Sequence, residues 1–499
     1  MESQNHLLTW MTFWPLIGMA VILCTPSRAK LFIKQIAFLF TIPSLLCGLR
    51  MLQLFDPAAE GYQFAAKVNW IESFHIYYQV GADGLSAPLI FLTVLLCPIC
   101  LLASWGINDR VKGYFSLFLL LETGMLGVFV ALDFFLFYLF WELMLLPMYF
   151  LIGVWGGPRR EYAAIKFFLY TLFGSVFLFI VMIVIYLYTG SFDLAQLGGQ
   201  IAESDLAAAN ALKWWLFLAL YVAFAIKIPA FPFHTWLPDA HVEAPTAISV
   251  ILAGILLKMG TYGLLRISYP LLPDMAIAFA VPIAVIALIN IVYGALAAMA
   301  QSDLKKLVAY SSISHMGIVM LGMAAMTREG MNGAVLQMFN HGTITAMLFL
   351  LVGVVYDRAH HRDIDGFGGL AKNMTTYAGF TAVAFFAALG LPGFSGFISE
   401  ILCFIGGFMS SFLAVKIIAV LGTSGILLGA VYLLWTYQRM FLGPLNEKYA
   451  DMPDCTLREI ATLAPLAVII TVLGIFPNLL IHLFEPSMNR LTDYLVKFM

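Results

Sequence analysis

Five ionisable side chains lie inside long apolar stretches of the sequence. Two are the lysines Lys227 and Lys258, and three are the glutamates Glu122, Glu142 and Glu400. An ionised side chain at the centre of a membrane costs about 2.5 to 3.5 kcal/mol on insertion scales, so such residues normally face a bundle interior and mark a pathway for ions. We expect these residues to form such a pathway, although a protonated, structural carboxyl is an alternative for Glu122.

Four histidines in or beside the apolar stretches extend this set. His234 and His241 follow Lys227, His315 lies in YSSISHMGIVML, and His341 lies in LQMFNHGTITAML. Imidazole takes and gives a proton near neutral pH, so we interpret His234, His315 and His341 as stations of a proton relay and His241 as a possible further member. A metal cluster is the alternative, but no two of them are three or four positions apart on one helix. We therefore expect no metal site.

The stretch AFAIKIPAFPFHTWLPDAH, residues 223–241, places a helix breaker beside Lys227. Pro229 has no amide hydrogen, so the carbonyl of Ala225 loses its helical partner, and a neighbour, a water or a cavity must satisfy that carbonyl inside a membrane. A second break is predicted at Pro392. The segments AIKIPAF and ALGLPGF around the two prolines share the pattern A-x-x-[IL]-P-x-F. Ordinary proline kinks are the alternative interpretation.

The composition shows that the chain is dissolved mainly in lipid. Of its 499 residues, 62% are hydrophobic and 11% are charged, against about 25% charged residues in soluble domains. Apolar runs near the roughly 20 residues that cross a membrane account for most of the length. The sequence therefore predicts an all-α polytopic membrane protein with about 14 transmembrane helices and no sizeable soluble domain. The predicted spans begin near Leu7, Gln35, Leu85, Tyr114, Asp133, Ala163, Trp214, Ala247, Met275, Leu307, Met331, Tyr377, Phe412 and Ile460.

Charge in the connections predicts the orientation. If the spans alternate, 16 lysines and arginines lie on one side, including Lys305 and Lys306, and 8 lie on the other, including Arg266. The more basic side is expected to be cytoplasmic, which places both termini on the outer side. The start of the chain, MESQNH, is polar and acidic, so we interpret the first apolar run as a retained helix and not as a signal peptide.

Two acidic positions beside the spans are interpreted as structural. Asp133 stands where a capping residue would begin the fifth span. Asp83 and Gly84, in GADGLS, are interpreted as a turn into the third span.

The two proline breaks divide the chain into related units. They fall in the seventh and twelfth spans, and an offset of five spans reverses the direction of crossing. Paired broken helices in two halves are the usual sequence sign of a transport site near the middle of the membrane. We therefore predict three N-terminal helices in residues 1–113, a first five-helix repeat in 114–273, a second, inverted repeat in 274–444, and a C-terminal loop with the last transmembrane helix in 445–499.

Four segments carry a resemblance to a known family. FWELMLLPMYFLIGVWG, AIKIPAFPFHTWLPDAHVEAPTAISVILAGILLKMGTYGLLR, QSDLKKLVAYSSISHMG and LPGFSGFISE resemble the antiporter-like subunits of respiratory complex I (NADH:quinone oxidoreductase), and most closely the chain M group. The resemblance spans essentially the whole chain. It implies a fourteen-helix subunit with two inverted five-helix repeats that translocates protons while a quinone is reduced elsewhere.

The same resemblance assigns roles to individual residues. It places the paired glutamate of the family on Glu142, the broken-helix lysine on Lys227 and the central lysine on Lys258. The acid of the twelfth helix falls on Glu400, and family histidines fall on His234, His315 and His341.

Glu400 also separates the related groups. Siblings of the L and N type, and subunits of multi-subunit sodium/proton antiporters, generally carry lysine there, so Glu400 favours chain M. The long sibling continues into a lateral helix, which we do not expect here because the chain stops at Met499. A subunit of a multi-subunit sodium/proton antiporter and an inert scaffold are the alternatives, and the electron donor, NADH or ferredoxin, stays open.

The resemblance further implies which molecules surround the chain. No cofactor is expected on this chain, and NADH, FMN, iron–sulfur clusters and quinone are expected on other subunits. The expected partners are the other membrane subunits of complex I, especially two antiporter-like siblings and the lateral helix of the long sibling, together with the lipid bilayer of a bacterial inner membrane. The near balance of 26 basic and 28 acidic residues gives no reason to expect nucleic acid.

A relay mechanism follows as a hypothesis. A charged Glu142 holds the proton on Lys227, and when Glu142 moves away or is neutralised, Lys227 releases that proton toward Lys258. The proton then passes His315 and His341 toward Glu400 and the outer side. An ion pair of Glu142 and Lys227 that only fixes packing is the alternative.

Overall fold

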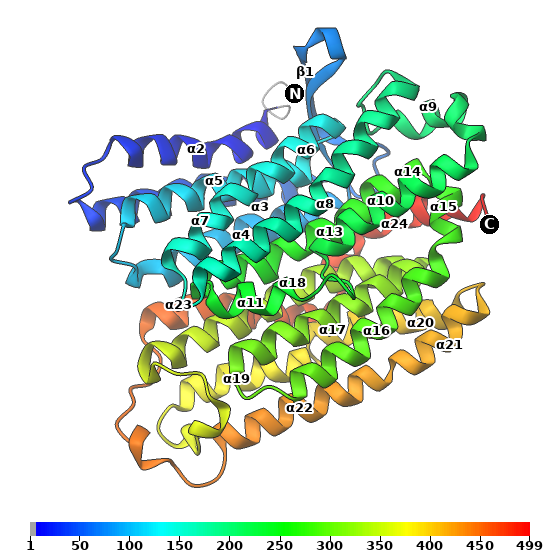
Figure 1. Cartoon of the computed structure of the whole chain (residues 1–499). Helices are drawn as coiled ribbons and strands as arrows, with labels where there is room; N and C mark the ends of the chain where they lie inside the picture. The colour runs from blue at the N-terminus through cyan, green and yellow to red at the C-terminus, as the bar shows by residue number, and fades with distance from the viewer. Residues whose placement is uncertain (1–5) are drawn as a thin grey trace.

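The computed structural model describes residues 6–499, and almost all of its regular structure is helical (Figure 1). Within these described residues, thirteen helical stretches are long and apolar enough to cross a membrane. The remaining predicted span, the twelfth, is a pair of shorter helices on either side of Pro392. The polytopic all-α fold is thereby confirmed. The polar start of the chain, which bears on the signal-peptide interpretation, lies mostly in residues 1–5, outside the described residues.

The N-terminal part contains four spanning helices and a hairpin that the sequence analysis did not predict. The two antiparallel strands of the hairpin pair Lys67 with Gln79 and Val68 with Tyr78. The elements are α2 (Leu7–Cys24), α3 (Lys30–Leu54), β1 (Gln63–Ile71), β2 (Ile76–Ala82), α4 (Ser86–Ala103) and α5 (Val111–Val130).

The middle of the chain contains the first broken helix. α10 ends at Lys227, and the chain resumes helical structure only at Trp236. The following span, residues 246–271, contains two π-helical segments, 252–256 and 264–268. The helices are α6 (Phe134–Leu143), α7 (Leu145–Trp155), α8 (Arg160–Thr189), α9 (Leu197–Glu203), α10 (Asn210–Lys227), α11 (Trp236–Glu243), α12 (Thr246–Ile251), α13 (Leu257–Gly263) and α14 (Tyr269–Leu271).

The last part contains the second broken helix and one further helix that was not predicted. α24 carries the polar residues His482, Glu485 and Asp493, so a search for uninterrupted apolar runs does not detect it. The helices are α15 (Pro273–Ala278), α16 (Ala280–Met299), α17 (Leu304–Ala324), α18 (Arg328–Ala359), α19 (Thr375–Ala388), α20 (Ser395–Met409), α21 (Leu413–Gly422), α22 (Ser424–Phe441), α23 (Leu457–Ile475) and α24 (Asn478–Val496).

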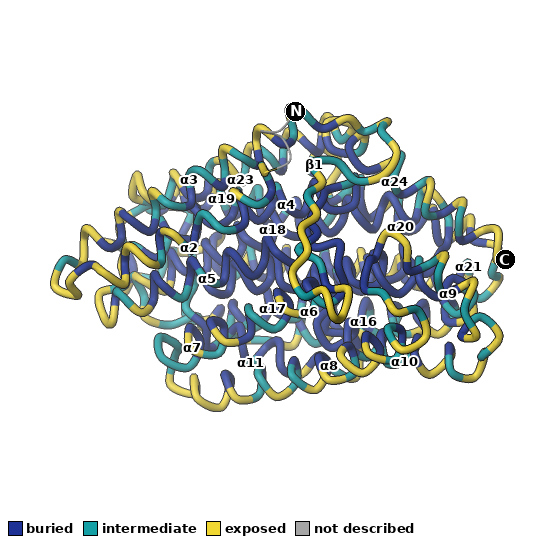
Figure 2. The backbone as a smooth tube through the Cα atoms, turned by 90° about the horizontal axis from the view of Figure 1, so that it is seen from above, coloured by how far each residue is buried: buried dark blue, intermediate teal, exposed yellow. Residues whose placement is uncertain are grey.

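Burial separates central helices from peripheral ones. In α18 and in residues 246–271, every residue of an apolar 18-residue segment is buried. In α2 only 33% of the corresponding segment is buried. Figure 2 shows the buried backbone concentrated in the middle of the bundle and exposed turns along α2, α3 and α8. The outer face of α8 exposes Leu169, Phe173 and Leu187. Large apolar side chains that face outward suit a hydrocarbon solvent, so the buried polar residues of the central helices are the ones that need explanation.

Contacts between connections define the two ends of the bundle. At one end, which we call the basic end, Arg159 approaches Glu243, Arg362 donates to the carbonyl of Val242, and Arg358 pairs with Glu459. At the other, which we call the hairpin end, the strands lie beside the start of α6, and α24 packs against the starts of α4 and α18. The contacts there are Tyr77 with Asp133, Gly84 with Ser487, and Arg328 with Asp493.

A short β-bridge occurs at each end. Asp133 pairs with Asp193 at the hairpin end, and Asp303 pairs with Asp363 at the basic end. As predicted for Asp133, the first aspartate of each bridge caps its helix, accepting from Leu136 N in α6 or from Lys305 N and Lys306 N in α17. Each aspartate of the second bridge lies the same number of positions along the sequence after the corresponding aspartate of the first. This correspondence at opposite ends is the pattern that an inverted repeat produces, and the repeat itself stays a prediction.

Asp83 and Arg266 form a buried ion pair at the hairpin end. Asp83 accepts the backbone N–H groups of Leu85 and Ser86, which is the predicted turn into α4. Its carboxylate also accepts from both terminal nitrogens of Arg266, one of them at 2.8 Å. Arg266 was expected among the basic residues of a connection, but its side chain is 7% exposed. Burial alone raises the pKa of Asp83, but the Arg266 guanidinium outweighs burial and holds that pKa below its ordinary value.

Arg266→Met is expected to destabilise the subunit by roughly 3–5 kcal/mol, because it leaves a buried carboxylate without its partner. Adding Asp83→Asn should restore much of that stability, since no unpaired charge remains. The measurement is thermal unfolding of the detergent-purified chain. Arg328→Met is the matched control, because the Arg328–Asp493 pair has exposed side chains and should contribute about 1 kcal/mol or less. Equal effects of the two arginine variants would contradict the assignment.

Candidate functional site

The break after Lys227 is closed by hydrogen bonds within the protein. The carbonyl of Ala225, which we expected to lack a helical partner, accepts from Ala230 N at 2.8 Å in a wider turn. The carbonyl of Ile226 accepts from Trp236 Nε1 at 2.9 Å. The expectation for Ala225 was incomplete, because a chain that passes a proline can still close one turn with the next free amide.

Asn290 of the neighbouring helix α16 forms hydrogen bonds with the backbone of the same break. Its Oδ1 accepts from Phe231 N at 2.7 Å, and its Nδ2 donates to the carbonyl of Pro229 at 3.1 Å. The side chain is fully buried. Sequence analysis missed this residue, although an asparagine within the apolar run AVPIAVIALINIVYGALAAM was a signal that could have found it.

Lys227 is buried in an aromatic environment. Within residues 6–499 its Nζ has no hydrogen-bond partner, and it lies 5.0 Å from the ring centroid of Trp141 and 5.7 Å from that of Phe167. Such rings attract a cation through their faces. Glu142 is the next residue after Trp141, but no ion pair of 4.0 Å or less joins it to Lys227 in the described chain. The structure therefore places the two predicted partners near each other without a direct ion pair.

Glu142 stands where α6 gives way to α7. Its Oε1 is buried without a partner in the described chain, and Ser175 of α8 lies beside the carboxyl. Ser175 also accepts a hydrogen bond from Trp141 Nε1 at 3.1 Å. Trp141 thus contacts the surroundings of both the acid and the base, and sequence reasoning had assigned it no role.

Lys258 lies in α13, directly after the first π-helical segment, and is completely buried. Its Nζ donates to the carbonyl of Ala253 at 2.5 Å and lies 2.6 Å from His341 Nδ1. A π-helical segment alters the regular i to i+4 pairing and often marks a functional site. Here a carbonyl of that segment is one of two partners of a buried amine.

His341, His315 and Glu400 continue from Lys258 across three helices. The imidazole rings of His341 (α18) and His315 (α17) are 5.7 Å apart between centroids, and His315 Nδ1 lies 3.0 Å from Glu400 Oε1 (α20). Gln337 Nε2 is 3.5 Å from the same oxygen. A cavity of about 10 Å³ between these side chains is about the size needed for one water. The structure therefore joins four predicted site residues into one buried row.

The other predicted site residues lie outside this row. His234 Nε2 is 3.3 Å from Tyr293 Oη, and His241 stacks on Phe349 with ring centroids 4.5 Å apart. Glu122 is completely buried beside Cys97 and Cys100. Neither oxygen of Glu122 and neither ring nitrogen of His241 has a hydrogen-bond partner in the described part of the chain.

Lys305 corrects the sequence analysis. It was counted with the basic residues of a connection, but it lies in the first turn of α17 and is only 4% exposed. Its Nζ donates to the carbonyl of Ala244 at 2.5 Å. The sequence QSDLKKL is typical of a charged segment in water. The pattern does not show which of its two adjacent lysines points into the bundle.

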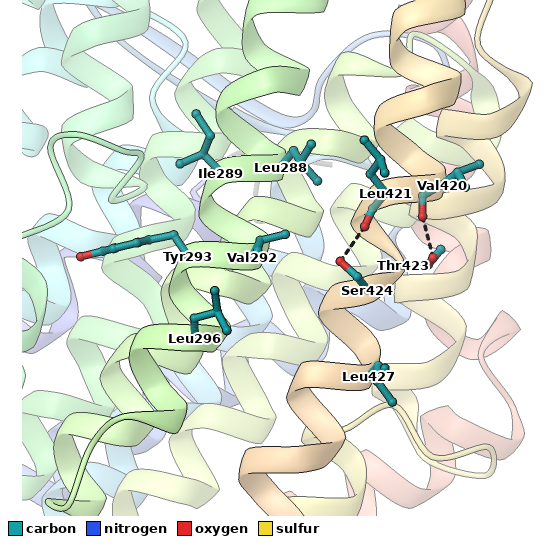
Figure 3. A pocket seen from close by; sticks show the side chains of 10 residues that line it. All are labelled: Leu288, Ile289, Val292, Tyr293, Leu296, Val420, Leu421, Thr423, Ser424 and Leu427. Atoms are coloured by element: carbon teal, nitrogen blue, oxygen red, sulfur yellow. Dashed lines mark hydrogen bonds between the residues drawn. The ribbon is translucent and has the colours of Figure 1, made fainter.

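A large groove on the surface is separate from these residues. It has a volume of about 870 Å³, lies between α16 and the α21–α22 pair, and is lined mainly by aliphatic side chains (Figure 3). Tyr293 belongs to its lining, but its ring points away from the groove in Figure 3, and its hydroxyl meets His234. None of the described residues that line the groove is charged, so the groove suits lipid or another helix and not a proton.

Comparison with known protein families agrees with this architecture. The family described as "NADH:quinone oxidoreductase/Mrp antiporter, TM" matches residues 131–428, which is more than half of the chain. The family described as "NADH-ubiquinone oxidoreductase chain 4, amino terminus" matches residues 61–132.

Curated relatives match the chain over nearly its whole length. NADH-quinone oxidoreductase subunit M of Rhodobacter capsulatus is 44% identical and covers 98% of this chain and 97% of its own. Subunit M of Rickettsia conorii is 42% identical over 97% and 98%. NADH-ubiquinone oxidoreductase chain 4 of Chondrus crispus is 40% identical over 93% of each chain.

Solved structures extend the comparison. A chain of respiratory complex I from Thermus thermophilus with bound NADH has a TM-score of 0.86 at 28% identity, covering 97% of this chain and 99% of its own. A chain of the Mrp complex from Dietzia has a TM-score of 0.85 at 22% identity over all of both chains, which shows the shared fold alone. The family resemblance is thus confirmed, and the chain belongs to the antiporter-like, proton-translocating M subunits of NADH:quinone oxidoreductase, respiratory complex I.

Proposed function

We propose that this subunit moves protons through Lys258, His341, His315 and Glu400, with Lys227 and Glu142 controlling when the row is loaded. The observation that carries the proposal is the succession of ionisable groups from Lys258 to Glu400, with contacts of 2.6 Å and 3.0 Å at its two ends and ring centroids 5.7 Å apart at the step between the two histidines. Amines, imidazoles and carboxylates placed within hydrogen-bond reach are the groups that transfer protons in proteins.

The step that loads the row, from Lys227 to Lys258, differs from the steps within the row. A β-carbon added at Gly260 would lie 2.7 Å from the carbonyl of Phe224 and equally close to Ile228, so α10 and α13 are in tight contact between the two lysines. Apolar packing of this kind blocks a continuous chain of hydrogen bonds. Transfer between the lysines therefore requires a rearrangement, which makes this contact the control point of the route.

Trp141 supports a switch at Lys227. Its ring meets the ammonium, and its indole N–H bonds to Ser175 beside Glu142. If Glu142 moves closer, its carboxylate replaces the Trp141 ring as the partner of the Lys227 ammonium and holds the proton on Lys227. If Glu142 moves away, Lys227 can release that proton. Charge changes in a neighbouring subunit that move α6 would thereby drive the release.

We infer the orientation and surroundings from charge and from the relatives. The basic end faces the cytoplasm of a bacterium, so both termini lie on the outer side of the inner membrane. The partners are the other membrane subunits of complex I, especially the two antiporter-like siblings and the lateral helix of the long sibling. No cofactor binds to this chain, and NADH, FMN, iron–sulfur clusters and quinone lie on other subunits.

Function in a multi-subunit sodium/proton antiporter is the second candidate, favoured by the fold shared with the Mrp chain. The high identity over the full length of M subunits favours complex I. Lys258, His315 and His341 also form a row of nitrogen ligands, and Na⁺ binds to oxygen, so the site suits protons.

Lys227→Ala is expected to reduce NADH-driven proton pumping by about tenfold or more, equivalent to a barrier raised by about 1.4 kcal/mol, because the loading group is lost. The measurement is acidification of proteoliposomes that contain the assembled complex. Lys213→Ala is the matched control: it removes a lysine from the same helix, but that lysine pairs with Asp274 at 2.6 Å, far along α10 from the break. Full pumping by the Lys227 variant would end the proposal for this residue.

Glu400→Gln should stop the last transfer, because an amide keeps the acceptor oxygen that faces His315 but does not take up a proton at neutral pH. Pumping is expected to fall by about tenfold, with the subunit still present in the complex. Ser399→Ala is the control, since it removes the 2.5 Å bond to Gln337 in the same turn of α20 without removing a titratable group. Similar losses in both variants would indicate a packing role for Glu400.

Proton pumping should be the same in sodium-free and sodium-containing media, because the row offers nitrogen ligands and one carboxylate. The measurement compares the initial rate of NADH-driven acidification in potassium and sodium buffers, together with uptake of labelled sodium. A rate that depends on sodium, or sodium uptake that stops when a protonophore dissipates the proton gradient, would support the antiporter alternative.

A further inference from the structure

Helix α16 contacts the first break at two points. Asn290 Oδ1 accepts from Phe231 N at 2.7 Å, and its Nδ2 donates to the carbonyl of Pro229 at 3.1 Å. Three positions further along α16, Tyr293 Oη lies 3.3 Å from His234 Nε2. Residues three positions apart lie on the same face of a helix, so one face of α16 follows most of the stretch between α10 and α11.

The same helix is in tight contact with α17, and Figure 1 shows the two side by side. Ser314 Oγ of α17 donates to the carbonyl of Ile291 in α16 at 2.8 Å. A β-carbon added at Gly294 would lie 2.7 Å from Ser314 N. One added at Gly317 would lie 2.9 Å from the β-carbon of Asn290. Small residues let two helices approach this closely, and close-packed interiors transmit displacement, so a shift of α16 also moves α17.

Helix α17 carries one side of the widest step in the row. His315 directly follows Ser314, and its ring centroid is 5.7 Å from that of His341 on α18. Nε2 of each ring is buried without a hydrogen-bond partner in residues 6–499. The contacts on either side of this step, Lys258 with His341 and His315 with Glu400, are already within hydrogen-bond reach. A small shift of α17 can therefore decide whether a proton passes between the two histidines.

The protonation of Lys227 provides a force at the other end of this connection. The ammonium lies 5.0 Å from the ring centroid of Trp141, and a cation is attracted to such a ring, whereas a neutral amine is not. A nearby carboxylate such as Glu142 attracts the cation in the same way. The end of α10 and the break that follows it therefore have different preferred positions when Lys227 is loaded and when it is empty.

We propose that Asn290 is a positioning residue that couples the loading of Lys227 to the proton step between His341 and His315. The two hydrogen bonds of Asn290 make α16 move with the break, and α16 moves α17 through the contact at Ser314. The distance between the two imidazole rings then changes with the state of Lys227. The proposal rests on the relay proposed above and adds the element that allows the outer step only after the inner one.

The test measures NADH oxidation and acidification together in proteoliposomes that contain the assembled complex. Asn290→Leu has a similar volume and removes both hydrogen bonds. It should lower the rate of proton pumping by about threefold or more, as expected for a residue that couples two sites. NADH oxidation should fall less, so that fewer protons are pumped per NADH, because the outer step no longer waits for loading. An unchanged ratio, with or without a slower rate, would overturn the proposal, since a purely structural asparagine affects both reactions equally.

Asn290→Asp is the conservative variant. It keeps the oxygen that accepts from Phe231 N, and in its protonated form it also donates to the carbonyl of Pro229. It should therefore retain more of the proton-to-NADH ratio than Asn290→Leu. Equal ratios in the two variants would contradict a role for these hydrogen bonds.

The contact between α16 and α17 is tested from its other side. Ser314→Ala removes the bond to Ile291 and should lower the same ratio, and the double variant with Asn290→Leu should pump no more slowly than Asn290→Leu alone. Losses that multiply would overturn a shared connection. Ser312→Ala is the matched control, because this buried hydroxyl donates to Val308 of its own helix at 3.2 Å. Equal effects of the two serine variants would also overturn the coupling.

Lys227→Ala distinguishes this proposal from the one it rests on. Slow pumping by Lys227→Ala, together with a normal rate and ratio in Asn290→Leu, would reject only the coupling through α16. Normal pumping by Lys227→Ala would reject the relay itself and the coupling with it. The amount of this subunit in each purified complex is measured, so that loss of assembly is not mistaken for loss of coupling.

Discussion

The constraint on which the structure depends is that a polar group in hydrocarbon must find its partners inside the protein. Lys258 satisfies it with a carbonyl of its own π-helical segment and with His341, and Glu400 satisfies it with His315. His341 and His315 come from helices other than those of Lys258 and Glu400, so α13, α17, α18 and α20 have to meet at one level. The most deeply buried spans, α18 and residues 246–271, are the ones that carry this row.

The same constraint explains how two helices can be broken inside a membrane. At the first break a wider turn, the Trp236 indole and Asn290 satisfy the backbone, so the carbonyls on both sides of the break are paired inside the protein. At the second, Asn340 of α18 donates to the carbonyl of Ser395, the first residue of α20. In both cases an asparagine from a neighbouring helix holds the break, and the functional side chain, Lys227 or Glu400, lies within two turns of it. Rigid support around an irregular backbone lets these side chains be positioned without the break collapsing.

Predictions from the sequence were most reliable where one residue is decisive. An ionisable residue within an apolar run has few roles, so the sequence alone singles out Lys258, His341, His315 and Glu400. The structure brings the four together, and their role in proton transfer stays a prediction. Residues whose role depends on the direction in which the side chain points were missed. Lys305 and Arg266 occur near the ends of spans, where the pattern is the same for a side chain that points to water and for one that points into the bundle. The hairpin and α24 were missed because neither is an uninterrupted apolar run.

The sequence by itself determined the solvent, the number of crossings, the two breaks and the identity of the ionisable groups, since each follows from composition, hydrophobic run length or the missing amide of proline. Tertiary structure alone decided which of these groups touch. Lys258 and His341 are far apart along the chain, and their 2.6 Å contact depends on how α13 and α18 pack. Glu142 and Lys227 were expected to pair, but the ring of Trp141 lies against the lysine instead. Helix rotation and packing decide such contacts at a scale of a few ångströms, and the linear pattern of residues does not contain that information.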